Sequence, residues 1–129
     1  MIRVGLDLVS VSSVQEALDA PHAERYLRRV YTEGEVADCQ NAEGTDAERL
    51  AARFAAKEAA LKVLPIGDEG VSMNCIEVRR ETSGRVWLEL HGHARTLASR
   101  AGIDELSLSL THEGGFAAAV VAADTRENA

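Results

Sequence analysis

At the start of the chain, hydrophobic residues alternate with other residues, as they do in a β-strand. From Met1 to Val9 every second position is aliphatic: Ile2, Val4, Leu6 and Leu8. A repeat of two is the period of a β-strand, and Val9 adds apolar bulk at its end. We therefore expect a buried strand over this segment, with Asp7 as its one acid.

Helix starts are predicted where Ser or Thr precedes Glu by three residues, because such a pair can satisfy free backbone amides in the first turn. Three pairs have this spacing: Ser13–Glu16, Thr32–Glu35 and Thr45–Glu48. They predict a short helix through Leu18, a helical turn after Thr32, and a long helix that ends near Leu64. Pro21 suits the first position of another helix, Pro21 to Val30, and Asn41 to Gly44 is expected to be a loop.

The second half predicts strands around one helix. The expected strands are Met73 to Arg80 and Arg85 to His91 around the turn Thr82–Gly84, then Leu106 to Thr111 and Phe116 to Ala122 around Gly114–Gly115. A helix from His93 to Arg100 should end at Gly102. The sequence thus predicts an α+β domain over residues 1–123, with an antiparallel sheet packed on one long helix and a frayed tail over 124–129.

Composition limits the function. The 129 residues suit one globular domain, with 46% hydrophobic and 27% charged residues. A net charge of −7 argues against a general nucleic-acid binder, which needs basic surface. No apolar run is long enough to span a membrane, no signal peptide is visible, and Cys39 and Cys75 form no metal-binding pattern. We expect a cytoplasmic protein.

The long helix carries the first candidate chemistry. Its Leu50, Phe54 and Leu61 share one arc that should face the core, while Glu58 and Lys62 lie together on its flank. They are either a solvated ion pair or an acid at the core boundary that needs a cation. Asp7 is either a strand-end cap or a second such acid. If the helix crosses the strand, two hard carboxylates converge, which suits Mg²⁺ and phosphate oxygens.

Two further features have competing interpretations. His112, before a Glu-Gly-Gly turn, is either a surface histidine or a proton carrier beside a ligand. Three arginines lie close together on an otherwise acidic chain: Arg25, Arg28 and Arg29. They form either a solvated helix face or a docking patch for an acidic protein partner.

Three segments, in order, resemble the holo-[acyl-carrier-protein] synthases, the small 4′-phosphopantetheinyl transferases. They are Gly5-Leu6-Asp7-Leu8-Val9, the stretch from Arg53-Phe54-Ala55-Ala56-Lys57-Glu58-Ala59 through Lys62, and Ser109-Leu110-Thr111-His112 followed by Phe116 to Val120. Thr32-Glu33-Gly34-Glu35 is similar to a short acidic helix start of the family. The resemblance covers nearly the whole chain.

The resemblance implies an α+β homotrimer that binds coenzyme A in clefts between subunits. It implies transfer of phosphopantetheine to a serine of an acyl carrier protein, with release of adenosine 3′,5′-bisphosphate. Asp7 and Glu58 would be the Mg²⁺ ligands, and Glu58 and Lys62 the catalytic residues. The coenzyme A contacts would be Arg53, Lys57, Lys62, Thr111 and His112. The arginines from Arg25 to Arg29 would receive the acidic helix of the carrier.

The serine also needs a proton acceptor, for which a water on the metal, or Glu58 acting through it, is the best candidate and His112 a weaker one. The chain departs from the family at four places: Ser13 for an arginine, Val63 to Gly67 for a glycine-rich turn, Gly84-Arg85-Val86 for Gly-Lys-Pro, and Ser107 for a histidine. These departures concern nucleotide affinity and carrier choice. A coenzyme A-binding member without catalysis and a trimeric interaction protein remain the competing hypotheses.

Overall fold

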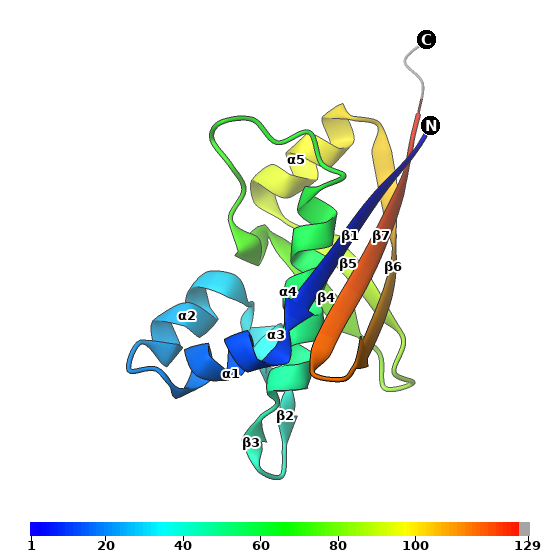
Figure 1. The fold of residues 1–129 in the computed structure, drawn as a ribbon. Coiled ribbons are helices and arrows are strands. Elements are labelled where there is room, and N and C mark those ends of the chain that lie inside the picture. Colours follow the sequence, from blue (N-terminus) through cyan, green and yellow to red (C-terminus); the bar gives the residue numbers. More distant parts are fainter. Residues whose placement is uncertain (127–129) are drawn as a thin grey trace.

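One long helix, α4 (Ala47–Leu61), lies across an antiparallel sheet of β1 (Ile2–Ser10), β7 (Phe116–Thr125) and β6 (Ile103–Glu113) (Figure 1). The computed structural model describes residues 1–126. Strand β7 is central and pairs with β1 on one side and β6 on the other. This arrangement confirms the predicted α+β fold.

The other elements pack around α4. Before it come α1 (Val11–Asp19), α2 (Ala23–Val30), α3 (Glu33–Asp38) and the short pair β2 (Gln40–Asn41) and β3 (Gly44–Thr45). After it come a 3₁₀ turn (Met73–Cys75), the hairpin β4 (Ile76–Arg80) and β5 (Val86–Leu90), and α5 (Gly92–Arg100). Within residues 1–126, no helix is both long and apolar enough to cross a membrane.

Helix α4 belongs to both hydrophobic cores. One core joins it to the sheet, the hairpin and α5, and the other joins it to α1 and the residues around α3. Most of its buried side chains are alanines, which are strong helix formers and allow neighbouring elements to approach closely. Its first turn is capped by Asp46, whose carboxylate accepts hydrogen bonds from the amides of Glu48 and Arg49.

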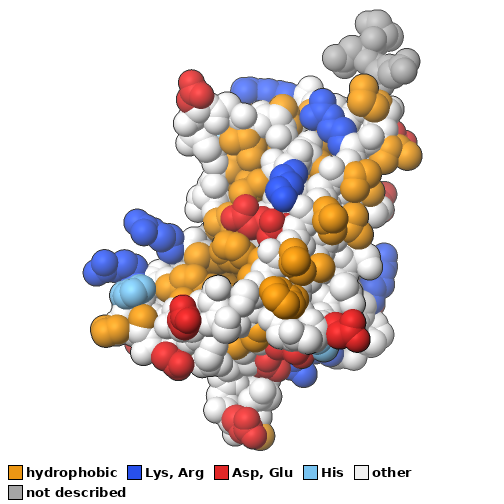
Figure 2. All heavy atoms as spheres, viewed as in Figure 1, with side chains coloured by type: hydrophobic (Ala, Val, Ile, Leu, Met, Phe, Trp, Pro, Cys, Tyr) orange, Lys and Arg blue, Asp and Glu red, His pale blue; other side chains and the backbone are white. Residues whose placement is uncertain are grey.

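The aliphatic stripe of β1 is exposed, so the prediction that it is buried is wrong. Ile2, Val4, Leu6 and Leu8 are 62–68% exposed, because Gly5, Asp7 and Val9 occupy the face toward α4. Phe116 and Val120 of β7 lie on the same outer face of the sheet, opposite Ser10 and Leu6. In Figure 2 these apolar side chains form a continuous column along β1. Alternation shows which residues share a face, but not which face the same chain covers.

Helix starts follow the predicted order but not every predicted cap. The box of Thr32 and Glu35 is present, with both reciprocal hydrogen bonds. The other two boxes are wrong: α1 begins after Ser10, which leaves Ser13 inside the helix, and α4 begins after Asp46. Helix α2 starts at Ala23, later than Pro21. The spacing alone does not place a cap: Ser13 has the backbone of a helix interior, and at α4 the next residue, Asp46, caps the helix in place of Thr45.

Strand ends also differ from expectation. Residues 73–75 form the 3₁₀ turn before β4, and the loop 41–44 is the turn of a small hairpin. Gly102, at φ +74°, ends α5 as predicted. Strand β7 continues through Asp124 and Thr125, where the Thr125 amide donates to the Met1 carbonyl, so the predicted tail is too long there. Residues 127–129 of that tail lie outside the described part of the chain.

Candidate active site

Gly5 lets α4 touch β1 beside the two candidate metal ligands. A Cβ atom at this position would lie 2.0 Å from the carbonyl oxygen of Ala59 and 3.1 Å from the Cβ of Lys62. Only glycine fits this approach of strand and helix. Asp7 lies two residues further along the same face of β1. The contact therefore brings Asp7 next to the turn of α4 that carries Glu58 and Lys62.

Two carboxylates and one ammonium share this place. Lys62 Nζ lies 3.3 Å from Asp7 Oδ1 and donates a hydrogen bond of 2.5 Å to the Leu6 carbonyl. Burial raises the pKa of Glu58, and the negative charge of Asp7 raises it further, while Lys62 opposes the shift. The helix thus crosses the strand at these acids. Glu58 and Lys62 form more than a solvated helix pair, because Asp7 of another element interacts with both.

The donor set fits a hard divalent cation. Carboxylate oxygens are the ligands that Mg²⁺ prefers, and two protein ligands leave coordination positions for water and phosphate. The raised pKa of Glu58 means that ionising this acid destabilises the free protein as pH rises through that pKa. A cation held between Asp7 and Glu58 would remove that cost.

Lys57, which the resemblance assigns to the coenzyme A contacts, is buried in the core of this chain. Its side chain is fully buried, and its Nζ lies 2.6 Å from Glu35 Oε1. The same ammonium donates to the carbonyls of Met73, at 3.0 Å, and Ile76, at 2.5 Å. All three donors of the ammonium have partners inside the protein. A phosphate cannot reach it in this conformation.

Arg53 lies on the other side of α4. It precedes Lys62 by nine residues, which at 3.6 residues per turn places the two side chains about 180° apart. Arg53 is 5% exposed and donates from Nη1 to the Arg49 carbonyl, at 3.3 Å, while its buried Nε has no protein partner. Arg53 and Lys62 of one chain therefore lie on opposite sides of α4.

Arg53 borders a groove along the seam between β5 and β6. The groove has a volume of about 610 Å³, and its polar lining consists of Arg53, Arg80, Arg85, Ser107 and Ser109 with one acid, Glu105. Three guanidinium groups and two hydroxyls suit a phosphate-bearing ligand. We did not predict Arg80 or Arg85 as site residues. The sequence does place these two arginines close together, because they lie on either side of the predicted hairpin turn.

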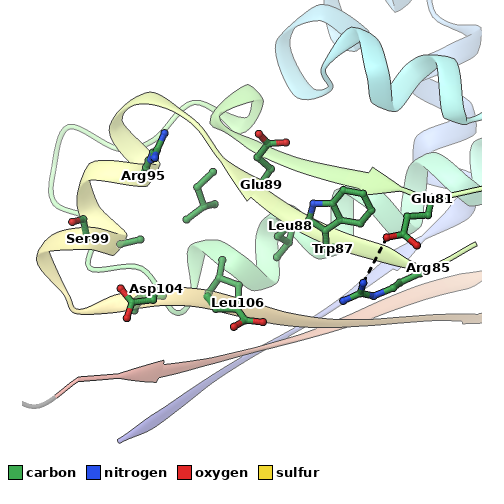
Figure 3. A pocket seen from close by; sticks show the side chains of 13 residues that line it. Glu81, Arg85, Trp87, Leu88, Glu89, Arg95, Ser99, Asp104 and Leu106 are labelled. Carbon is green, nitrogen blue, oxygen red and sulfur yellow. Dashed lines mark ion pairs between the residues drawn. The ribbon is translucent and has the colours of Figure 1, made fainter.

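The seam continues past Trp87 toward α5, where its charge changes. Figure 3 shows this second part, in which Glu81, Glu89, Asp104 and Glu105 outnumber the arginines, and Glu81 pairs with Arg85 at 3.6 Å. An anionic ligand would therefore be retained only in the half next to Arg53.

His112 lies far from Glu58 within one chain. Its Nδ1 is 3.1 Å from Glu48 Oε1 in the first turn of α4. Glu48 precedes Glu58 by ten residues, or about 15 Å along the helix. The neighbouring Thr111 is exposed on β6. Within one chain, Asp7, Glu58 and Lys62 therefore form one group, while Arg53 lines the groove and Thr111 and His112 follow its lining residues Ser109 and Leu110 on β6. These two groups of residues are the candidate half-sites.

The three arginines of α2 are all exposed. Among the described residues none of the three forms an ion pair, although the Arg28 carbonyl accepts a hydrogen bond from the Asn74 side chain. Arg25 and Arg29 are one turn apart, and Arg28 lies beside them. The patch is free to meet an acidic surface.

A second group of possible metal ligands lies on the hairpin. Side-chain atoms of Glu77, Glu89 and His91 lie within 4.8 Å of one another. Each already has a partner: Glu77 binds His91 at 2.9 Å and Thr32 at 2.6 Å, and Glu89 pairs with Arg79 at 2.8 Å. These bonds hold the hairpin against the start of α3.

Comparison with known proteins gives a consistent family. The model of the 4′-phosphopantetheinyl transferase superfamily, ACPS, matches residues 3–121. The chain is 42% identical over 120 residues to the holo-[acyl-carrier-protein] synthase of Moorella thermoacetica, covering 93% of this chain and 91% of that protein. It is 45% identical over 123 residues to that of Anaeromyxobacter dehalogenans, covering 94% of each.

Solved structures agree. An ACPS–CoA complex from Chronobacterium ammoniagenes has a TM-score of 0.81 at 33% identity, covering 98% of this chain and 99% of that one. The Helicobacter pylori holo-[acyl-carrier-protein] synthase in complex with coenzyme A has a TM-score of 0.79 at 27% identity, covering 95% and 100%. The motifs, the fold and these matches agree along nearly the whole chain, and the chain belongs to the holo-[acyl-carrier-protein] synthase family of 4′-phosphopantetheinyl transferases.

Proposed function

We propose that the chain transfers the 4′-phosphopantetheine group of coenzyme A to a serine of an apo acyl carrier protein. The observation that carries this proposal is the meeting of Asp7, Glu58 and Lys62 where α4 crosses β1. The similar proteins are holo-[acyl-carrier-protein] synthases, and several of the similar structures are complexes with coenzyme A.

In this reaction the serine oxygen forms a bond to the phosphorus next to the pantetheine. The pyrophosphate bond breaks, and adenosine 3′,5′-bisphosphate leaves with the bridging oxygen. Asp7 and Glu58 would hold Mg²⁺, which would neutralise charge on the pyrophosphate. Lys62 would stabilise the negative charge of the same oxygens with its half-exposed ammonium. Glu58, whose pKa is raised, is the better proton acceptor of the two acids for the serine hydroxyl, directly or through a water.

The two half-sites support a composite active site between subunits. We propose that three copies form a closed ring, in which Asp7, Glu58 and Lys62 of one subunit face the groove beside Arg53 and His112 of the next. The exposed stripe of Ile2, Val4, Leu6 and Leu8, with Phe116 and Val120, supports this assembly. Such a contiguous apolar face is typical of an interface. A head-to-tail contact that closes after three copies buries the stripe in every subunit.

Incubation with apo carrier protein, coenzyme A and Mg²⁺, followed by mass spectrometry of the carrier, tests the activity. We expect the mass of one phosphopantetheine group to be added at a serine. If coenzyme A binds but no carrier is modified, the chain is a binding protein without catalysis. If coenzyme A does not bind at all, an interaction protein is the better description.

We further propose that Arg25, Arg28 and Arg29 receive the carrier. An acyl carrier protein is acidic and this chain has a net charge of −7, so attraction must come from a local basic patch. Helix α1 carries no basic residue, and Ser13 stands where the resemblance implies an arginine. Helix α2 provides the basic patch in this chain.

Arg28→Glu should raise the KM for the carrier roughly five- to tenfold at low salt, because exposed charges govern encounter. The KM for coenzyme A should not change. Steady-state kinetics at two salt concentrations measure both effects, and the variant should respond less to salt than the wild type does. Arg100→Glu, an exposed arginine on α5, is the matched control. Wild-type carrier kinetics in Arg28→Glu would place the docking face elsewhere.

A further inference from the structure

A buried ion pair lies next to the candidate metal ligand, and the proposed reaction does not use it. The side chains of Lys57 and Glu35 are both 0% exposed, and Lys57 directly precedes Glu58 on α4. Burying two charges is costly, and apolar residues of similar size are often at least as stabilising. Stability alone therefore does not explain an ion pair at this position.

The pair connects α4 to two other elements through directed hydrogen bonds. Lys57 bonds Glu35 of α3 and the carbonyls of Met73 and Ile76 at the start of β4. Glu35 is itself fixed, because Oε1 accepts from the Thr32 amide at 2.8 Å and Oε2 from the Val78 amide at 2.8 Å. Neither side chain can turn without breaking several bonds in the core.

The opposite side of the same helix turn is fixed by a steric contact. Ala59 packs its carbonyl against Gly5 so closely that a single methyl group would not fit. Glu58 thus lies between two anchors: a hydrogen-bonded anchor at Lys57, toward α3 and β4, and a steric one at Ala59, toward β1.

Such anchoring matters because helix rotation moves the carboxylate of Glu58. A helix with its side chains is about 10–12 Å wide, so a rotation of roughly 20° displaces a side-chain tip by about 2 Å. Mg²⁺ requires near-ideal geometry with ligand distances of about 2.0–2.1 Å. A rotation of that size would separate Glu58 from an ion held by Asp7.

We propose that Lys57 and Glu35 are positioning residues that fix the rotation of α4, so that Glu58 faces Asp7. The proposal rests on the metal site of the proposed function. It assigns to the lysine of the Lys-Glu motif a role in orienting the neighbouring ligand, with no contact to the substrate.

Mn²⁺ binding tests the proposal without relying on turnover. Titration of wild type and Lys57→Met, followed by electron paramagnetic resonance of free Mn²⁺, should show at least tenfold weaker binding by the variant. The Mg²⁺ concentration for half-maximal transfer should rise by a similar factor. Ile103→Ala is the matched control, because it removes a buried side chain at the start of β6 and should lower the melting temperature while leaving the Lys57–Glu35 pair and Gly5 unchanged.

Lys57→Met leaves Glu35 charged and unpartnered, so the double variant Lys57→Met with Glu35→Gln is tested as well. It removes both charges and should fold better than the single variant, yet still bind Mn²⁺ weakly. A folded variant with wild-type Mn²⁺ affinity would show that the pair only stabilises the core and would overturn the proposal. If wild type does not bind Mn²⁺, or if Asp7→Ala binds it as tightly as wild type does, the proposed metal site is wrong. The positioning role would then be wrong with it.

Discussion

Asp7→Ala and Glu58→Ala should each lower the rate of phosphopantetheine transfer about 1,000-fold, which corresponds to about 4 kcal/mol of lost transition-state stabilisation. Each change removes one of the two protein ligands that we assign to the ion. The double variant should lose little more than either single variant, because residues that act as a unit give non-additive losses.

Transfer rates at saturating Mg²⁺, measured for both single variants and the double variant, complete the cycle. Glu69→Ala provides the control, since Glu69 is an exposed acid that pairs with His93 away from this site. Near wild-type activity is expected for it. Losses from Asp7 and Glu58 that multiply in the double variant would show that the two acids do not share one ion.

Two inactive variants should restore activity when they assemble together. Glu58→Ala destroys the half-site with Lys62, and Arg53→Met destroys the half-site beside the groove while keeping most of the buried volume. In a ring of three with a composite site at each contact, every mixed trimer contains one contact where both halves are intact. Equal, random mixing should therefore restore about a quarter of the wild-type activity.

Mixing after dissociation and reassembly, followed by the transfer assay, measures this recovery. Glu58→Ala mixed with Asp7→Ala is the control, because both variants damage the same half-site and no contact becomes intact. Recovery in neither mixture would mean that each chain builds its whole site alone.

Local patterns in the sequence predicted most of the secondary structure. The long helix, the hairpin around Gly114–Gly115 and the cap at Gly102 depend on residues near one another in the chain, and these predictions are confirmed. The capping boxes at Ser13 and Thr45 were wrong because α1 begins three residues earlier, after Ser10, and α4 is capped by the neighbouring Asp46.

The site was less predictable, because it depends on contacts between distant segments. Asp7 and Glu58 were recognised as candidates, but only the contact of Gly5 with Ala59 shows why they meet. The burial of Lys57 was not predicted, since its partner, Glu35, lies 22 positions earlier and no periodicity indicates that a lysine is buried. The exposed face of β1 was missed for the same reason: one chain's alternation is equally compatible with a core inside the subunit and a core shared between subunits.

In the proposed trimer, the exposed face of β1 would make the folding of this chain depend on its concentration. Inside the subunit, the long helix contributes mainly alanines, whose burial releases little free energy, whereas larger aliphatic side chains lie uncovered on β1. If neighbouring copies cover those side chains, much of the hydrophobic stabilisation is gained between molecules and grows with their concentration. At low protein concentration the chain would then unfold and lose its active site at the same time. The cell would therefore obtain an active carrier-modifying enzyme only above a threshold level of expression.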